Sequence, residues 1–102
     1  MADFVAVAQL DQLPPGRGMV VTVRGLAVAL FNVEGTVYAL EDTCRHAGAS
    51  LGGGELRGAL VRCPAHGWRY DVRTGHTTHE PGYGVASFPV QIVDGSILVA
   101  LG

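Results

Sequence analysis

Cys44-Arg45-His46 and Cys63-Pro64-Ala65-His66 are the two short segments on which the fold of this chain depends. They contain the only two cysteines of the protein and two of its four histidines. Two thiolates and two imidazoles suit a zinc ion, and they also suit a [2Fe–2S] cluster in which two histidines replace two cysteines on one iron. A disulfide between the two cysteines is a third interpretation, but it leaves both Cys–His spacings as coincidences.

The order of the ligands within each segment favours the cluster. Structural zinc sites usually place two cysteines in one short segment and two histidines in another. Here each segment supplies one cysteine and one histidine, so one iron can take both thiolates and the other iron both imidazoles. The pattern C-x-H…C-x-x-H, followed by Gly67-Trp68-Arg69-Tyr70-Asp71, resembles the motif of the Rieske family.

The resemblance implies an all-β fold, in which an antiparallel β-sandwich carries a small inserted cluster-binding subdomain of two loops, from about residue 41 to residue 70. It also implies one [2Fe–2S] cluster per chain. Cys44 and Cys63 would hold the inner iron, and His46 and His66 the outer iron that takes up the electron.

Three further residues are expected beside the ligands. By resemblance, the hydroxyl of Tyr70 reaches a ligand cysteine, and the loop that contains Pro81 covers one face of the cluster. Trp68 suits a place in the core as well as an exposed contact for a partner, since tryptophan is enriched at interfaces. The apolar tip expected to pass electrons consists of His46, Ala47, Pro64, Ala65, His66, Trp68 and Pro81.

Short apolar runs separated by turn residues predict strands along most of the chain. Three such runs predict consecutive antiparallel strands, at residues 19–23, 26–31 and 36–40. Residues 86–93 and 96–101 predict a closing hairpin, because Asp94-Gly95 between apolar runs is typical of a tight two-residue turn. No segment repeats with a period of 3.6 residues, so little or no helix is expected.

The stretch between the two ligand segments is rich in glycine. Gly52-Gly53-Gly54 has two compatible interpretations, a flexible turn or a bare backbone whose N–H groups approach the cluster sulfurs. After it, residues 55–62 predict a short strand pair with its turn at Arg57-Gly58, and residues 70–72 predict a further strand.

The bulk composition describes a single globular domain spanning residues 1–102. The chain is 48% hydrophobic and 16% charged, which excludes a disordered protein. A net charge of −2, with no basic patch in the sequence, argues against a nucleic-acid partner. No run is long enough to span a membrane, and the first residues do not resemble a signal peptide. A cytoplasmic protein is therefore expected.

A Rieske-like chain of this length resembles the free-standing ferredoxin of bacterial ring-hydroxylating dioxygenase systems. The resemblance implies a one-electron carrier between a flavin-dependent ferredoxin reductase and a terminal non-haem iron oxygenase, in the catabolism of aromatic hydrocarbons. The chain itself is not expected to be an enzyme, because no nucleophile and base form a catalytic set. Two alternatives stay open: a small Rieske-like subunit of an assimilatory nitrite reductase, and a zinc-stabilised binding module.

The resemblance also predicts a low reduction potential. Rieske proteins of quinol-oxidising complexes carry a disulfide where this chain has Ala49 and Ala65, and a serine donor where it has Trp68. Each hydrogen bond lost from a cluster sulfur lowers the potential. A value near the negative end of the Rieske range, roughly −150 to +300 mV, is expected.

Overall fold

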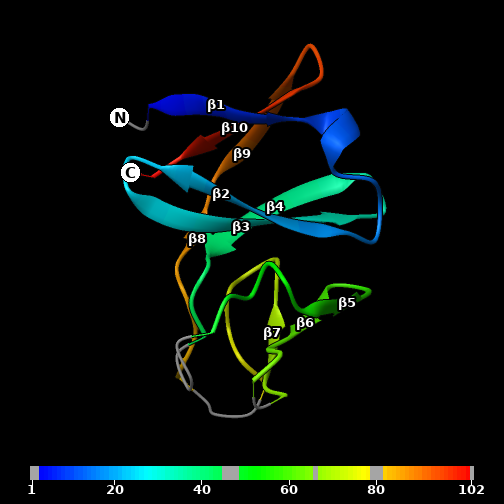
Figure 1. Cartoon of the computed structure of the whole chain (residues 1–102), viewed down its shortest axis with the longest axis vertical. Helices are drawn as coiled ribbons and strands as arrows, with labels where there is room; N and C mark the ends of the chain where they lie inside the picture. Colours follow the sequence, from blue (N-terminus) through cyan, green and yellow to red (C-terminus); the bar gives the residue numbers. More distant parts are fainter. Residues whose placement is uncertain (1–2, 45–48, 66, 79–81, 102) are drawn as a thin grey trace.

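The computed structural model describes residues 3–44, 49–65, 67–78 and 82–101. These residues form ten strands and one short 3₁₀ turn, Leu10–Gln12 (Figure 1). Within them, no helix is long and apolar enough to cross a membrane. The predicted all-β fold is confirmed. The strands are β1 (Phe4–Gln9), β2 (Gly18–Val23), β3 (Leu26–Val33), β4 (Thr36–Glu41), β5 (Glu55–Arg57), β6 (Leu60–Arg62), β7 (Arg69–Asp71), β8 (Ser87–Phe88), β9 (Val90–Val93) and β10 (Ser96–Ala100).

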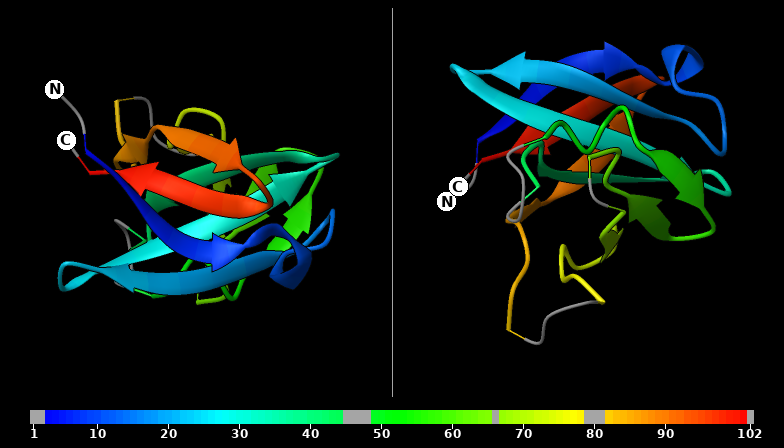
Figure 2. Two further views of the ribbon diagram at one scale, coloured as in Figure 1. Left: turned by 90° about the horizontal axis from the view of Figure 1, so that it is seen from above. Right: turned by 60° about the horizontal axis from the view of Figure 1, so that its bottom comes forward.

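The strands form three antiparallel sheets. The first has the order β1-β10-β9, the second β2-β3-β4-β8 and the third β5-β6-β7. The first two pack face to face as a sandwich at one end of the molecule, and the third lies at the other end (Figures 1 and 2). The three runs predicted at residues 19–40 are β2, β3 and β4, paired in sequence order as expected.

Strand β3 is buried on both faces and joins the two ends of the molecule. Side chains alternate across a strand, so Val28 and Leu30 enter the core between the first two sheets. Ala29 and Phe31 enter a second core, which they share with the third sheet. Because all four side chains are fully buried, one strand supports both the sandwich and the smaller sheet.

The predicted closing hairpin is correct only in its second half. The structure divides residues 86–93 at Pro89: β8 pairs with β4 in the second sheet, and β9 pairs with β10 in the first. Proline has no N–H to continue a ladder, whereas the Pro89 carbonyl accepts a hydrogen bond from Ala100 at 3.1 Å. The turn at Asp94-Gly95 is as predicted, with both residues at positive φ.

Smaller differences concern the third sheet. β5 and β6 are joined by residues 58 and 59, one position later than the predicted turn. Gly58 has a φ of 59°, a left-handed conformation that favours glycine. The following strand, predicted at residues 70–72, is β7, which begins and ends one residue earlier.

Close packing explains two of the three consecutive glycines. A Cβ on Gly54 would lie 2.1 Å from the carbonyl oxygen of Arg62, and one on Gly52 would lie 2.3 Å from a methyl of Val20. Their N–H groups donate to Asp42 and to the Leu51 carbonyl. The interpretation that these N–H groups approach cluster sulfurs is therefore wrong for Gly52 and Gly54.

Gly54→Ala should lower the free energy of unfolding by about 1–3 kcal/mol, because the added methyl meets backbone that cannot move aside cheaply. Gly53→Ala is the matched control, since a Cβ there meets nothing within 4 Å. Urea denaturation followed by circular dichroism measures both variants. Equal losses would show that the Arg62 carbonyl does not limit this position.

Candidate metal centre

The two cysteines are buried together in the second core. Cys44 follows β4 and Cys63 follows β6 directly, and both pack in the cluster that includes Leu51 and Val61. Their relative exposures are 1% and 0%. Neither belongs to a disulfide, so the disulfide interpretation finds no support.

Each cysteine lies at the neck of a short loop. Each neck is closed by a backbone hydrogen bond of the same pattern, from the cysteine N–H to the carbonyl five residues later. The N–H of Cys44 donates to the carbonyl of Ala49 at 2.8 Å, and the N–H of Cys63 donates to the carbonyl of Trp68 at 2.6 Å. In the second loop the N–H of Gly67 also returns to the Cys63 carbonyl at 2.9 Å, with Gly67 at a φ of 76°. Two separate segments thus present a thiol at equivalent positions of equal-length loops.

The two predicted histidine ligands fall within these loops by sequence. His46 lies between Cys44 and Ala49, and His66 lies between Cys63 and Trp68. Both are outside the described residues, so their role as ligands stays a prediction. Pro81, expected to cover the cluster, is likewise outside the described residues.

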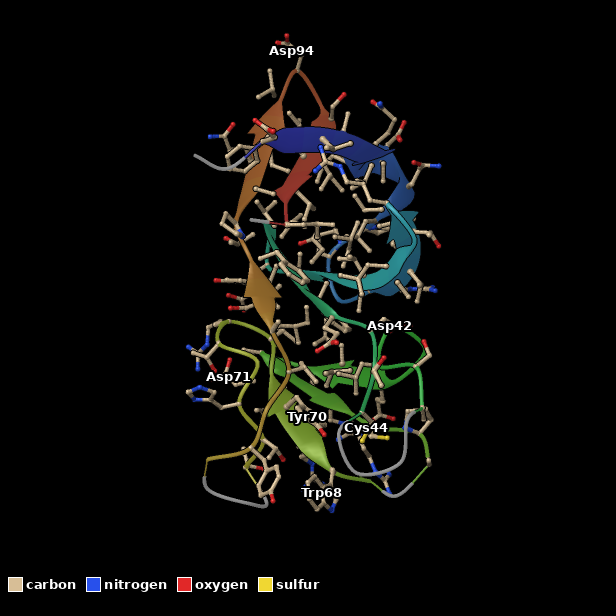
Figure 3. The ribbon with its side chains drawn as sticks, turned by 90° about the vertical axis from the view of Figure 1, so that its left-hand side faces the viewer. Asp42, Cys44, Trp68, Tyr70, Asp71 and Asp94 are labelled. Atoms are coloured by element: carbon tan, nitrogen blue, oxygen red, sulfur yellow. The ribbon has the colours of Figure 1, made fainter. Side chains whose placement is uncertain are left out.

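Tyr70 connects β7 to the first cysteine. Its hydroxyl oxygen lies 3.3 Å from Sγ of Cys44, where either atom can donate (Figure 3). The tyrosine is completely buried, and the pairing of β7 with Val61 on β6 fixes its position. The resemblance implies a contact of this tyrosine with a ligand cysteine. The structure shows the contact with Cys44, and the role of Cys44 as a ligand stays a prediction.

Asp42 anchors the first loop to the sandwich, a role that was not predicted from the sequence. Its carboxylate accepts hydrogen bonds from the Ser50 hydroxyl and the Gly52 N–H, both at 2.6 Å. Its own N–H donates to the Ala27 carbonyl on β3 at 3.0 Å. The sequence signal for this role is an acidic residue two positions before Cys44, followed by a glycine-rich stretch whose N–H groups need acceptors. Asp42 therefore holds both stems of the loop against the second sheet.

Trp68 is partly buried rather than fully in the core. It packs against the second core from the end of the molecule farthest from the sandwich (Figure 3). Pro64 and Ala65, two other residues of the expected tip, are exposed. The described part of the tip thus offers an accessible apolar surface beside the buried thiols.

An ion pair closes the turn that follows β7. The Arg73 guanidinium donates to both carboxylate oxygens of Asp71, at 3.0 and 2.8 Å, and holds the pKa of that carboxyl below its usual value. The Asp71 carbonyl also accepts the N–H of Gly75 at 2.7 Å. Because the folded pKa lies below the unfolded one, the stabilisation is present at neutral pH and is lost as the pH falls through the lowered pKa.

The donor set fits a thiolate-bound metal centre. Two cysteines buried in one core can hold a metal centre between them once their thiols are deprotonated. Soft thiolate ligands favour iron–sulfur clusters, zinc and copper(I). Tyr70 adds a hydroxyl beside one sulfur, as expected of a metal centre whose ligands are oriented by neighbouring hydrogen-bonding groups.

Comparison with known proteins identifies the metal centre. Residues 3–89 match the family described as the Rieske [2Fe-2S] domain. The ferredoxin component of the naphthalene 1,2-dioxygenase system of Pseudomonas aeruginosa is 33% identical over 99 residues, which are 96% of this chain and 95% of that protein.

Solved structures agree with this match. The ferredoxin of carbazole 1,9a-dioxygenase from Nocardioides aromaticivorans IC177 superposes with a TM-score of 0.89 at 38% identity, over 95% of this chain and 96% of that one. A ferredoxin solved in complex with the oxygenase of carbazole 1,9a-dioxygenase superposes with a TM-score of 0.87 at 33% identity, over 95% of this chain and 92% of that one. A small subunit assigned to an NADH-dependent nitrite reductase of Mycobacterium tuberculosis superposes with a TM-score of 0.90 at 27% identity, over 100% of this chain and 97% of that one.

The match over most of the chain excludes the zinc-stabilised module and makes a [2Fe–2S] cluster the cofactor. Relatives of full length at this identity are electron-transfer components rather than catalytic oxygenases. The chain therefore belongs to the Rieske [2Fe–2S] family, and within it to the small ferredoxins that carry electrons.

Proposed function

We propose that this chain delivers single electrons to a terminal oxygenase through a [2Fe–2S] cluster held by Cys44, His46, Cys63 and His66. The observation that carries the proposal is the pair of buried thiols at the necks of two equivalent loops. The sequence places one histidine within each loop. In this proposal residues 41–70 form the cluster-binding part of a single domain that spans the chain.

The partners follow from the relatives. One relative was solved as an oxidised ferredoxin bound to its reduced oxygenase, which supports an oxygenase as the acceptor of electrons here. A flavin-dependent ferredoxin reductase in the cytoplasm is the proposed donor. The system would act on an aromatic compound, as the naphthalene and biphenyl systems of the relatives do by name.

The residues of the chain provide the conditions for carrying an electron. When bound, the cluster accepts one electron and releases it again. Burial of Cys44 and Cys63 keeps water from the sulfurs, and the rigid second core limits rearrangement around them. The Tyr70 hydroxyl stabilises negative charge on the Cys44 sulfur, and the tip around Trp68 gives a partner close approach.

A permanent subunit of an assimilatory nitrite reductase is the second candidate. The fold does not separate the two, because the nitrite reductase subunit superposes as well as the ferredoxins do. The higher identity to dioxygenase ferredoxins favours the first. Size-exclusion chromatography of the chain from its native host decides: a lone small protein supports a ferredoxin, and co-elution with a large reductase supports the subunit.

Protein purified under reducing conditions should be brown-red and hold about two iron and two sulfide per chain. Cys63→Ser should remove the visible absorption, because the second loop loses its thiolate and cluster binding is coupled to ordering of the site. Iron and sulfide analysis with electron paramagnetic resonance of the reduced protein measures this. A colourless wild-type protein that contains one zinc ion would refute the proposed cofactor.

The reduction potential should lie in the lower part of the Rieske range of roughly −150 to +300 mV. Tyr70→Phe should lower it further, by about 60 mV, if the hydroxyl donates a hydrogen bond of about 1.4 kcal/mol to Cys44. Tyr38→Phe is the control, since Tyr38 packs against the same core on β4. Protein-film voltammetry measures all three proteins. An unchanged potential in Tyr70→Phe would show that the 3.3 Å contact does not act on the cluster.

Asp42→Ala should destabilise the first loop by about 1–3 kcal/mol, because the buried Gly52 N–H loses its acceptor. The visible absorption of the variant should bleach faster than that of wild type in urea. Ser50→Ala removes a donor but leaves Gly52 paired, so its effect should be smaller. If both variants bleach at the wild-type rate, Asp42 does not anchor the loop.

A further inference from the structure

The outward face of the third sheet gathers arginines that are dispersed in the sequence. The register pairs Glu55 with Arg62 and Arg62 with Arg69 across the three strands. Leu56, Val61 and Tyr70 alternate with them and face the second core. The charged side chains are therefore left on the solvent side. The arginines of β5–β7 and of the turn after β7 are Arg57, Arg62, Arg69 and Arg73.

Two of these arginines are neutralised within the face and two are not. Glu55 pairs with Arg57, and Asp71 pairs with Arg73. Among the described residues, no ion pair forms with Arg62 or Arg69. These two lie directly opposite each other on neighbouring strands, an arrangement in which like charges destabilise a sheet. The fold thus places two arginines at opposed positions of β6 and β7, with Glu55 on β5 opposite Arg62.

Both arginines line one groove. It has a volume of about 370 Å³ and is lined by Glu55, Arg57, Leu60, Arg62 and Arg69. A guanidinium binds a carboxylate through two parallel hydrogen bonds, and Leu60 adds an apolar contact between the charges. Because Glu55 is engaged by Arg57, the groove keeps capacity for one or two carboxylates from outside the chain.

The groove adjoins the second ligand loop. Arg62 directly precedes Cys63, and Arg69 directly follows Trp68, whose carbonyl closes the loop neck. A carboxylate held in the groove would therefore be fixed beside the loop that presents a thiol of the cluster site. The protein carries a net charge of −2, so this face is a local exception to its overall charge.

We propose that the outward face of the third sheet is an electrostatic docking surface that receives carboxylates of the oxygenase. The inference rests on the proposed function and adds to it a second contact beside the apolar tip. Opposite charges steer two proteins into one orientation and raise the rate of encounter. A nucleic acid is not the occupant, because the small patch is set in a negatively charged protein.

Voltammetry on an electrode coated with a carboxylate-terminated monolayer tests the surface with a defined acidic probe. Cluster-loaded wild type and Arg62→Gln/Arg69→Gln are compared at low ionic strength and pH 7.5. The interfacial electron-transfer rate of the variant should fall on the order of tenfold, at an unchanged amount of iron per chain. The control is Arg17→Gln/Arg24→Gln, which removes the same charge from exposed positions of the sandwich and should keep the wild-type rate.

Equal rates in all three proteins, or equal losses in both double variants, would overturn the docking surface. In both of these outcomes the wild-type protein still shows a reversible one-electron wave. A wild-type protein without this wave would overturn the proposed function instead. Arg62→Lys/Arg69→Lys keeps the charge and should recover most of the rate. If the glutamine variant does not fold, retention of wild type on a carboxymethyl resin decides: retardation despite the negative net charge supports the surface, and elution in the void volume overturns it.

Discussion

The burial of β3 on both faces is the constraint on which the rest of the structure depends. Its alternate side chains complete the core of the sandwich with Val28 and Leu30, and the core around the two thiols with Ala29 and Phe31. The metal centre is therefore packed against a strand that has no freedom to shift, since any movement would disturb both cores. This packing allows two short loops, each closed at its neck by a backbone hydrogen bond, to present their thiols in fixed positions.

The family and the consecutive strands β2, β3 and β4 could be predicted because their signals are local. Two cysteines and two histidines at the spacing of the ligand segments indicate one cofactor, and apolar runs separated by turn residues indicate β2, β3 and β4. The positive φ values at Asp94 and Gly95 agree with the turn that this residue pair predicts. In each case the physical cause acts over a few neighbouring residues.

The remaining features depend on contacts between distant segments. Pro89 was visible inside the predicted strand, but which sheet each half joins depends on packing against β4 and β10. The role of Asp42 depends on Ser50 and Gly52 returning to it across a loop. The absence of a basic patch in the sequence was misleading, because pairing of β6 with β7 brings together arginines seven residues apart.

Strands β5, β6 and β7 have three residues each. Because they are so short, the third sheet is less stable than the sandwich. Strands of this length are at the lower limit of stable pairing. The third sheet therefore relies on its packing against the second core and on the cofactor bound beside it. Most strands of the sandwich are longer, and the sandwich has a core of its own. Loss of the metal would therefore loosen one half first, and amide hydrogens of β6 and β7 would exchange with solvent while those of β3 and β10 stay protected.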